Sequence, residues 1–162
     1  MPNSDFEIRV GGRNDVACIA AMANGFRRLQ GREHPTEAEL AERISLLLDD
    51  SDTEFLVALD TDGRCAGFLQ QRYRRTIWKD GGDAYLETVF VTEHCRGVGL
   101  GEHLVEAAMG RARDRGCSMI TLDTSERNVR AIALYERLEF ANTGGPDSEI
   151  SGGRQLWFER PL

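Results

Sequence analysis

The spacing of apolar and polar residues changes several times along the chain, and each spacing predicts one type of element. Residues 6–10 alternate apolar with polar side chains, as in a strand with one buried face. Over 16–26 the apolar residues recur every three or four positions, which predicts a helix. Thr36 and Glu39 form a capping box, and the apolar positions that follow predict a second helix. The chain is therefore predicted to open with one strand and two helices.

Strand patterns and turn residues come next and predict an antiparallel run. Residues 54–59 and 65–73 have strand patterns, and the Asp-Gly pair at 62–63 between them is typical of a tight hairpin turn. The Gly-Gly pair at 81–82 predicts a second turn before a third strand over 84–91. Three consecutive antiparallel strands are therefore expected.

The last part of the chain alternates between the two spacings. A helical pattern begins at Leu100, a strand pattern covers 119–123, and a second helical pattern covers 126–137. Two more strands are predicted, one near Phe140 and one over 155–160. The complete predicted order is β-α-α-β-β-β-α-β-α-β-β.

One strand–helix–strand unit, over residues 84–123, should join two parallel strands by a right-handed crossover. The other connections favour antiparallel neighbours. The predicted fold class is therefore α/β (α+β): a mixed, mostly antiparallel sheet of six to seven strands, flanked by about four helices.

The length of 162 residues fits a single domain over 1–162. With 41% hydrophobic and 29% charged residues, the composition is that of an ordinary globular protein. No apolar run approaches the roughly 20 residues that cross a bilayer, so no membrane partner is expected. The first residues do not resemble a secretory signal, and a cytoplasmic location is therefore expected.

The four cysteines are scattered along the chain: Cys18, Cys65, Cys95 and Cys117. They form no Cys-x-x-Cys pair, and in a cytoplasmic chain they are expected to be reduced thiols. Neither Cys95 nor Cys117 has a spaced partner that would make it a nucleophile. The three histidines show no metal-ligand spacing, so no metal site is expected.

The formal net charge of −7 argues against a nucleic-acid partner, because such a partner needs a basic face. The charge is compatible with a cationic substrate, such as a polyamine or an aminosugar, although solubility alone also explains it. An acidic chain that binds an anionic cofactor must bind it with local donors. A cluster of glycines in the chain can supply such donors.

That cluster lies between the strand over 84–91 and the next helix, and it reads Arg96-Gly97-Val98-Gly99-Leu100-Gly101. Glycines let the backbone approach a ligand closely. The first turn of a helix adds free N–H donors and partial positive charge, and Arg96 adds a cation. The segment is therefore predicted to bind a phosphate or a diphosphate, the alternative being a glycine-rich turn without a ligand.

Two common phosphate-binding motifs do not fit the cluster. A Walker A loop needs a lysine after its last glycine, and none follows here. The dinucleotide fingerprint needs a third glycine at the position of Glu102, and hairpins rather than a βα unit precede the loop. Nucleoside triphosphates and nicotinamide dinucleotides are therefore not favoured as ligands.

Two blocks resemble the GCN5-related N-acetyltransferase (GNAT) superfamily. Residues 96–101 match its Q/R-x-x-G-x-G/A signature, and residues 128–140 resemble its N-x-x-A-x-x-x-Y-E-x-x-G-F stretch. Glu139 stands where the family usually has glycine, so the turn after that helix is expected to differ. The resemblance is strong over 84–140 and rests on element order elsewhere. It implies a GNAT-like acyl-CoA N-acyltransferase fold, with acetyl-CoA as co-substrate and no metal.

The resemblance also assigns residues to acetyl-CoA. In the family the glycine loop holds the diphosphate, and the end of the preceding strand pairs with the pantetheine arm. The backbone N–H of Val91 would donate to the thioester carbonyl. One face of the helix over 126–137 would place Asn128 and Ala131 along the arm and Tyr135 at the sulfur. The expected cofactor-binding residues are Phe90, Val91, Arg96, Gly97, Val98, Gly99, Leu100, Gly101, Asn128, Ala131 and Tyr135.

Two residues are expected to be catalytic. The resemblance makes Tyr135 the general acid, which protonates a departing thiolate whose pKa is near ~8.5. Related enzymes carry a glutamate base on the strand before the loop, and Glu87 lies there. The base takes the proton of the amine directly or through a chain of water molecules. The alternatives are a core tyrosine and an exposed strand glutamate.

The acceptor site, as in relatives, should lie beside the first helices and the loop over 144–153. Five acidic residues were expected to surround it: Asp49, Asp50, Asp52, Asp147 and Glu149. They favour the primary amine of a small cationic molecule, acetylated by direct transfer in a ternary complex. The alternatives are protein N-termini or lysines, which need an open groove, a non-catalytic acyl-CoA sensor, and a partner-binding domain without a cofactor. Relatives are often dimers, so a homodimer is expected.

Overall fold

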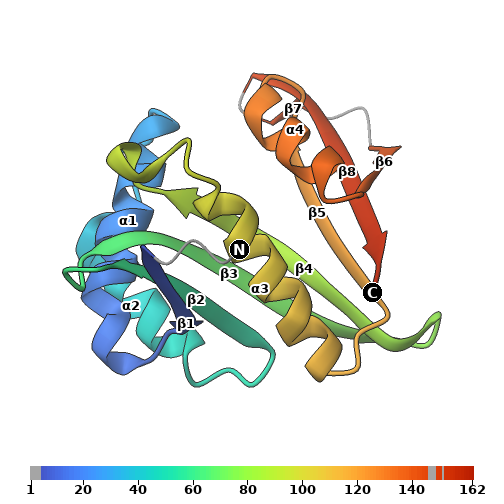
Figure 1. The fold of residues 1–162 in the computed structure, drawn as a ribbon, viewed down its shortest axis with the longest axis horizontal. Coiled ribbons are helices and arrows are strands. Elements are labelled where there is room, and N and C mark those ends of the chain that lie inside the picture. The colour runs from blue at the N-terminus through green and yellow to red at the C-terminus, as the bar shows by residue number, and fades with distance from the viewer. Residues whose placement is uncertain (1–4, 146–148, 151) are drawn as a thin grey trace. The chain divides into compact units, whose positions relative to one another are not determined.

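The computed structural model describes residues 5–145, 149–150 and 152–162. Figure 1 shows the helices and strands. In chain order they are β1 (Phe6–Val10), α1 (Val16–Leu29), α2 (Glu37–Leu47), β2 (Thr53–Asp60), β3 (Cys65–Thr76), β4 (Lys79–Val91), α3 (Leu100–Asp114), β5 (Met119–Ser125), α4 (Val129–Arg137), β6 (Ala141–Gly144), β7 (Glu149–Ile150) and β8 (Gly153–Pro161). Two short 3-10 turns, η1 (Arg13–Asp15) and η2 (Glu93–Cys95), precede α1 and α3.

The strands form a mixed sheet in the order β1-β2-β3-β4-β5-β8-β6, and the two-residue β7 pairs with β8. Strands β4 and β5 are parallel, with Ala84 opposite Ile120, whereas β1–β2, β2–β3, β5–β8 and β6–β8 are antiparallel. The parallel pair flanks α3 in the sequence, as predicted for residues 84–123. The predicted fold class is therefore confirmed.

The chain divides into two compact units. The N-terminal unit comprises Met1–Arg72 and Thr88–Ala108, and the C-terminal unit comprises Tyr73–Glu87 and Met109–Leu162. Each unit thus combines two separate stretches of the chain. The expectation of a single domain over 1–162 stays a prediction.

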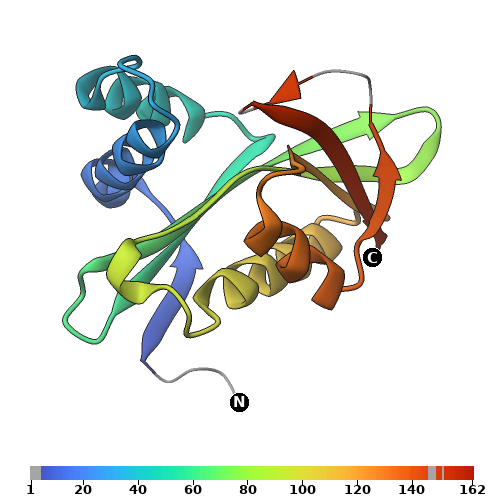
Figure 2. The same ribbon diagram turned by 90° about the horizontal axis from the view of Figure 1, so that it is seen from above.

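In the N-terminal unit, α1 and α2 cover one face of the strands. Alternation along β3 places Phe68 on this face and Gly67 on the other, where a Cβ at Gly67 would lie 3.1 Å from Leu104 of α3. Figure 2 shows α1 and α2 on one side of β2 and β3 and the start of α3 on the other. The core below α1 and α2 consists of Ile19, Ala20, Met22, Ile44, Phe55, Val57, Phe68 and Phe90.

Side chains fix the starts of the first two helices in different ways. The predicted capping box of α2 is present: the Glu39 N–H donates to Thr36 Oγ1 at 3.3 Å, and the Thr36 N–H donates to Glu39 Oε2 at 2.6 Å. Asp15 occupies the N-cap position of α1 but makes no side-chain cap there. Its carboxylate instead accepts hydrogen bonds from Arg9 and from the Gly12 N–H, and these bonds lower the pKa of Asp15.

In the C-terminal unit, α4 packs against the strands through one buried tyrosine. The Tyr135 ring lies 5.7 Å from Phe140 and 6.0 Å from Phe158 of β8, between ring centroids. The helix begins at Val129 rather than at residue 126, because the Asn128 side chain caps it by accepting the Ala131 N–H at 3.3 Å.

The prediction of a turn at Gly81-Gly82 is wrong. Strand β3 continues to Thr76 and β4 begins at Lys79, so the turn falls at residues 77–78 and both glycines lie inside β4. Gly81 has a φ of 68°, and a Cβ there would lie 1.8 Å from the carbonyl oxygen of Gly116. These glycines therefore serve a close backbone approach rather than a hairpin turn.

The expectation of four reduced thiols also needs correction. Cys18 of α1 and Cys65 of β3 form a disulfide with a Cα–Cα distance of 6.0 Å, across 47 residues of sequence. The packing of α1 over the strands brings the two cysteines together, and their scattered spacing gave no sign of it. Cys95 and Cys117 are free and buried. No helix among the described residues has both the length and the apolar character needed to cross a membrane.

Candidate active site

The glycine loop lies in the N-terminal unit and leads directly into α3. Gly97 and Gly99 have φ values of 81° and 83°, a conformation that favours glycine over every other residue. The His103 N–H donates to the Gly99 carbonyl oxygen at 3.1 Å, so the hydrogen-bond ladder of α3 begins at Gly99. The glycines thus fix the path of the backbone into the helix.

The geometry of this loop suits a diphosphate. The first N–H groups of a helix have no acceptor within the helix, and the dipole adds partial positive charge at the same end. A Cβ at Gly97 would meet no atom within 4 Å, so the space beside the backbone is open to a ligand. A diphosphate group can therefore lie against the main-chain amides of this segment.

Arg96 is held beside the loop by the end of β4. Its Nε donates to the Val91 carbonyl oxygen at 3.0 Å, and its guanidinium lies 5.8 Å from the centroid of the Phe90 ring. The side chain is exposed to solvent. An anchored cation of this kind can contact a phosphate oxygen while remaining accessible.

The predicted residues at the end of β4 lie on different sides of the strand. The Phe90 ring packs on Phe26 and Phe68, with centroid distances of 6.1 Å and 6.2 Å, and belongs to the core. The Val91 side chain lies near Gly67, on the side of the strands away from Phe68. Any contact of Phe90 with a cofactor would therefore go through its backbone.

Two of the predicted residues in the C-terminal unit, Asn128 and Ala131, lie at the start of α4. Asn128 is exposed, and its side-chain oxygen is already used to cap the helix at Ala131. This leaves its side-chain NH₂ group for a ligand. Ala131 is half-buried. Their roles toward acetyl-CoA stay predictions.

Tyr135 is buried, with 7% of its surface exposed. Burial, followed by the negative charge of Asp123, raises the pKa of the Tyr135 phenol to about 12. The hydroxyl is therefore protonated at neutral pH, which is the state that a general acid requires.

Asp123, on β5, is a feature that the sequence analysis missed. Its carboxylate accepts hydrogen bonds from the Tyr85 hydroxyl and from Gln155 Nε2, the latter at 2.8 Å. Tyr85 lies on β4 and Gln155 on β8, so the group forms only when the strands pair. The one available signal was Asp123 in the strand pattern over 119–123, and this gave no indication of its partners.

Glu87, the predicted base, is an exposed residue of β4 in the C-terminal unit. Alternation predicts Thr88 and Phe90 on one face of the strand. The side chains of these two residues do lie on the side of α1 and α2, because Phe90 packs in that core and Thr88 lines a pocket there. The role of Glu87 as a base stays a prediction.

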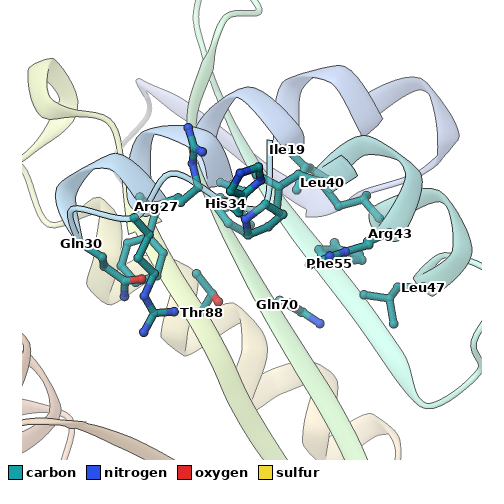
Figure 3. Close-up of a pocket in the computed structure, with 16 residues that line it drawn as sticks. Ile19, Arg27, Gln30, His34, Leu40, Arg43, Leu47, Phe55, Gln70 and Thr88 are labelled. Atoms are coloured by element: carbon teal, nitrogen blue, oxygen red, sulfur yellow. The ribbon is translucent and has the colours of Figure 1, made fainter. Parts of the chain in front are cut away.

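That pocket lies within the N-terminal unit and holds about 250 Å³ (Figure 3). Its walls come from α1, α2 and the segment between them, and its floor comes from β2, β3 and β4. Apolar side chains such as Ile19, Leu40 and Phe55 line it together with the polar Gln70 and Thr88. A pocket with an apolar body and a few polar groups is typical of a small-molecule site.

Three of the expected acidic residues, Asp49, Asp50 and Asp52, are not among the described residues that line this pocket. Asp49 pairs with Arg13, and Asp50 accepts hydrogen bonds from the Asp52 N–H at 2.9 Å and from the Thr53 hydroxyl at 3.1 Å. These carboxylates are thus used locally, in the turn between α2 and β2. Asp147 and the side chain of Glu149 lie outside the described residues.

The chain resembles several proteins of known fold and family. It is 35% identical over 132 residues to the mycothiol acetyltransferase of Salinispora tropica, an alignment that covers 80% of this chain and 42% of that protein. The chain spans less than half the length of the mycothiol acetyltransferases that it matches.

Solved structures share its fold at lower sequence identity. A spermidine N-acetyltransferase from Vibrio cholerae, in complex with CoA and spermine, has a TM-score of 0.81 at 18% identity, over 98% of this chain and 96% of that one. A phosphinothricin acetyltransferase from Sinorhizobium meliloti, in complex with AcCoA, has a TM-score of 0.78 at 23% identity, over 98% of this chain and 89% of that one. The model of the acetyltransferase (GNAT) family matches residues 19–140. The chain therefore belongs to the acetyltransferase (GNAT) family.

Proposed function

We propose that this protein is an N-acetyltransferase that moves the acetyl group of acetyl-CoA to the primary amine of a small molecule, by direct transfer in a ternary complex. The observation that carries the proposal is the glycine loop, in which Gly97 and Gly99 lead with positive φ into the N-terminus of α3. Family membership supports it, as do the solved neighbours in complex with CoA or AcCoA.

The proposed roles fall on residues of the glycine loop, of β4 and of α4. Acetyl-CoA supplies an activated acyl group as a thioester. In the N-terminal unit, the main-chain amides of residues 97–101 and the Arg96 guanidinium hold its diphosphate, and the Val91 N–H donates to the carbonyl where negative charge develops. In the C-terminal unit, the Tyr135 hydroxyl holds a proton at neutral pH for the departing sulfur.

The amine must lose a proton before it attacks. Glu87 is the proposed base, either directly or through water, since it is an exposed carboxylate on the strand that leads to Val91. A primary amine is mostly protonated at neutral pH, so this step limits the fraction of reactive acceptor.

The pocket beside α1 and α2 supports a small acceptor rather than a protein chain. Its volume of about 250 Å³ and its helical walls suit one small molecule. The cationic acceptor expected from the sequence gains no support there, because the described residues that line the pocket include no carboxylate. A cytoplasmic location and a homodimer stay predictions.

The substitution Tyr135→Phe tests the proposal. It removes the donated proton and keeps the ring that packs on Phe140 and Phe158. We expect kcat for thiol release to fall by about 100-fold or more, since a general acid contributes at least that much. The dissociation constant for CoA, measured by calorimetry, should stay within about twofold. Tyr73→Phe, at another buried tyrosine of the same unit, is the matched control and should keep its activity.

Other outcomes would replace the proposal by a different function. If the wild-type protein binds CoA but releases no thiol with any amine or peptide, a sensor of acyl-CoA is the better description. If peptide N-termini or lysines react far better than every small amine, acetylation of proteins is the better description of the function. If CoA neither binds nor raises the melting temperature, acetyl transfer is excluded.

A further inference from the structure

The pocket of the N-terminal unit carries a charge opposite to that of the whole chain. The formal net charge is −7, yet the described ionisable residues that line the pocket are basic: Arg27, Arg32, His34 and Arg43. Ionisable residues placed at random on an acidic chain would include carboxylates. This local excess of positive charge therefore needs its own explanation.

Arg27 is the most firmly placed of these four residues. Its guanidinium donates to the Glu33 carbonyl oxygen and to Asn24 Oδ1, which fixes its orientation at the end of α1. Its Nε is buried and has no hydrogen-bond partner among the described residues. This buried atom does not itself face the open pocket, so Arg27 contributes its positive charge to the pocket rather than a bond from Nε.

Arg43 and Arg32 add positive charge that the described residues do not neutralise. Both side chains are exposed, and neither forms an ion pair or a side-chain hydrogen bond with another described residue. Carboxylates do lie near the lining. Glu39 is 3.6 Å from His34, and Glu37 accepts a hydrogen bond from Asn24, the hydrogen-bond partner of Arg27. Arg27 and Arg43 come from different helices and line the same pocket (Figure 3).

The rest of the pocket can hold the remainder of a small amine. Apolar side chains such as Ile19 and Phe55 offer a surface for an apolar body, and Gln70 and Thr88 offer polar groups on the floor. Thr88 lies on β4, three residues before Val91, the position assigned to the thioester carbonyl. The floor of the pocket thus includes a residue of the strand that ends at Val91.

We propose that this pocket recognises an oxyanion, a carboxylate or a phosphate, on the acceptor itself, so that the substrates are small primary amines that also carry an anionic group. The inference rests on the proposed function and names its substrate class. Arginine binds carboxylate and phosphate oxygens through charge-assisted hydrogen bonds. A polyamine would face like charges in the same place and would bind less well.

The experiment compares pairs of amines with and without an anionic group, with kcat/KM expressed per neutral amine because the two members of a pair differ in amine pKa. Phenylalanine and phenylalaninamide test the carboxylate, O-phosphoethanolamine and ethanolamine test the phosphate, and spermidine represents cationic acceptors. We expect the oxyanion member of at least one pair to have a kcat/KM about tenfold or more above its partner and above spermidine, because a hydrogen bond to a charged group is worth that much. Arg43→Gln should reduce this ratio toward one by slowing only the anionic substrates.

Arg28→Gln is the matched control, since Arg28 is an exposed residue of α1 that does not line the pocket. This variant should keep the wild-type ratio. The proposal is overturned, with the acetyltransferase function intact, if amides or spermidine react as well as the anionic amines. It is also overturned if Arg43→Gln leaves the preference for anionic amines unchanged.

A binding measurement separates this inference from the proposed function. If no amine is acetylated, the chain saturated with CoA is titrated by calorimetry with N-acetylphenylalanine and with its amide. If the carboxylate binds more tightly than the amide, and Arg43→Gln abolishes this difference, the oxyanion site is supported even though the proposed enzymatic function fails. Equal binding of the two compounds would overturn the proposed oxyanion site as well.

Discussion

Glu139 has a backbone conformation that glycine usually takes. Its φ is 61°, and among the described residues it is the one non-glycine residue with a positive φ. It follows α4, where the Phe140 N–H donates to the Tyr135 carbonyl oxygen at 2.9 Å. The sequence comparison with the GNAT motif marked this position as a departure from glycine. Glu139 thus takes the left-handed conformation that favours glycine, and the expected difference of this turn from the family stays a prediction.

Glu139→Gly should therefore stabilise the protein. A left-handed conformation costs a non-glycine residue about 1 kcal/mol, and glycine removes this cost. The ion pair of Glu139 with Arg160, at 3.1 Å, is lost, but an exposed pair contributes little. We expect a net gain of about 0.5 to 1 kcal/mol in the free energy of unfolding, measured with urea. Glu139→Gln keeps the strain and should show no gain, and a glycine variant less stable than wild type would refute the explanation.

Tyr135 shows how far single residues could be predicted. Helical spacing and the family motif identified it, because both are local properties of the sequence. The raised pKa of the Tyr135 phenol depends on burial and on the charge of Asp123. Asp123 lies on β5, and this strand pairs with β4 and β8 only in the folded sheet. No local pattern contains that information.

At the scale of elements, the junction between β4 and α3 is the feature on which the function depends. Gly97 and Gly99 hold positive φ values, and α3 begins at Leu100, where the sequence placed it. The capping box of α2 was also predictable, since both partners lie within four residues. Such local signals identified most of the helices and strands.

Gly99→Ala tests the role of this junction. Alanine at a φ of 83° costs about 1 to 2 kcal/mol and moves the first amides of α3 away from their present directions. We expect the dissociation constant for CoA to rise about tenfold, as measured by calorimetry. Gly110→Ala, inside the same helix and with no atom within 4 Å of the added Cβ, should bind CoA as wild type does. Unchanged affinity in Gly99→Ala would show that the loop conformation is not needed for binding.

Elements that depend on distant partners were predicted less well. Gly81 looked like a turn residue, but it lies in β4 against the backbone of Gly116. Cys18 and Cys65 meet because α1 packs over β3, across 47 residues of sequence. In both cases the deciding neighbour is far along the chain, so the local pattern alone indicated something else.

At the scale of the whole molecule, net charge proved a poor guide to the charge of a site. Asp49 and Asp50, in the turn between α2 and β2, are engaged in a local ion pair and in local hydrogen bonds, whereas arginines are among the residues that line the pocket of the N-terminal unit. Net charge is a sum over the surface, and it says little about how charges are distributed. The fold class, by contrast, followed from the order of elements and was confirmed.

The most direct test of the central claim is a crystal structure of this protein with CoA. We expect the diphosphate oxygens to accept hydrogen bonds from the main-chain N–H groups of residues 97–101, with Arg96 beside them. CoA bound with its diphosphate elsewhere, while these amides face only solvent, would contradict the account.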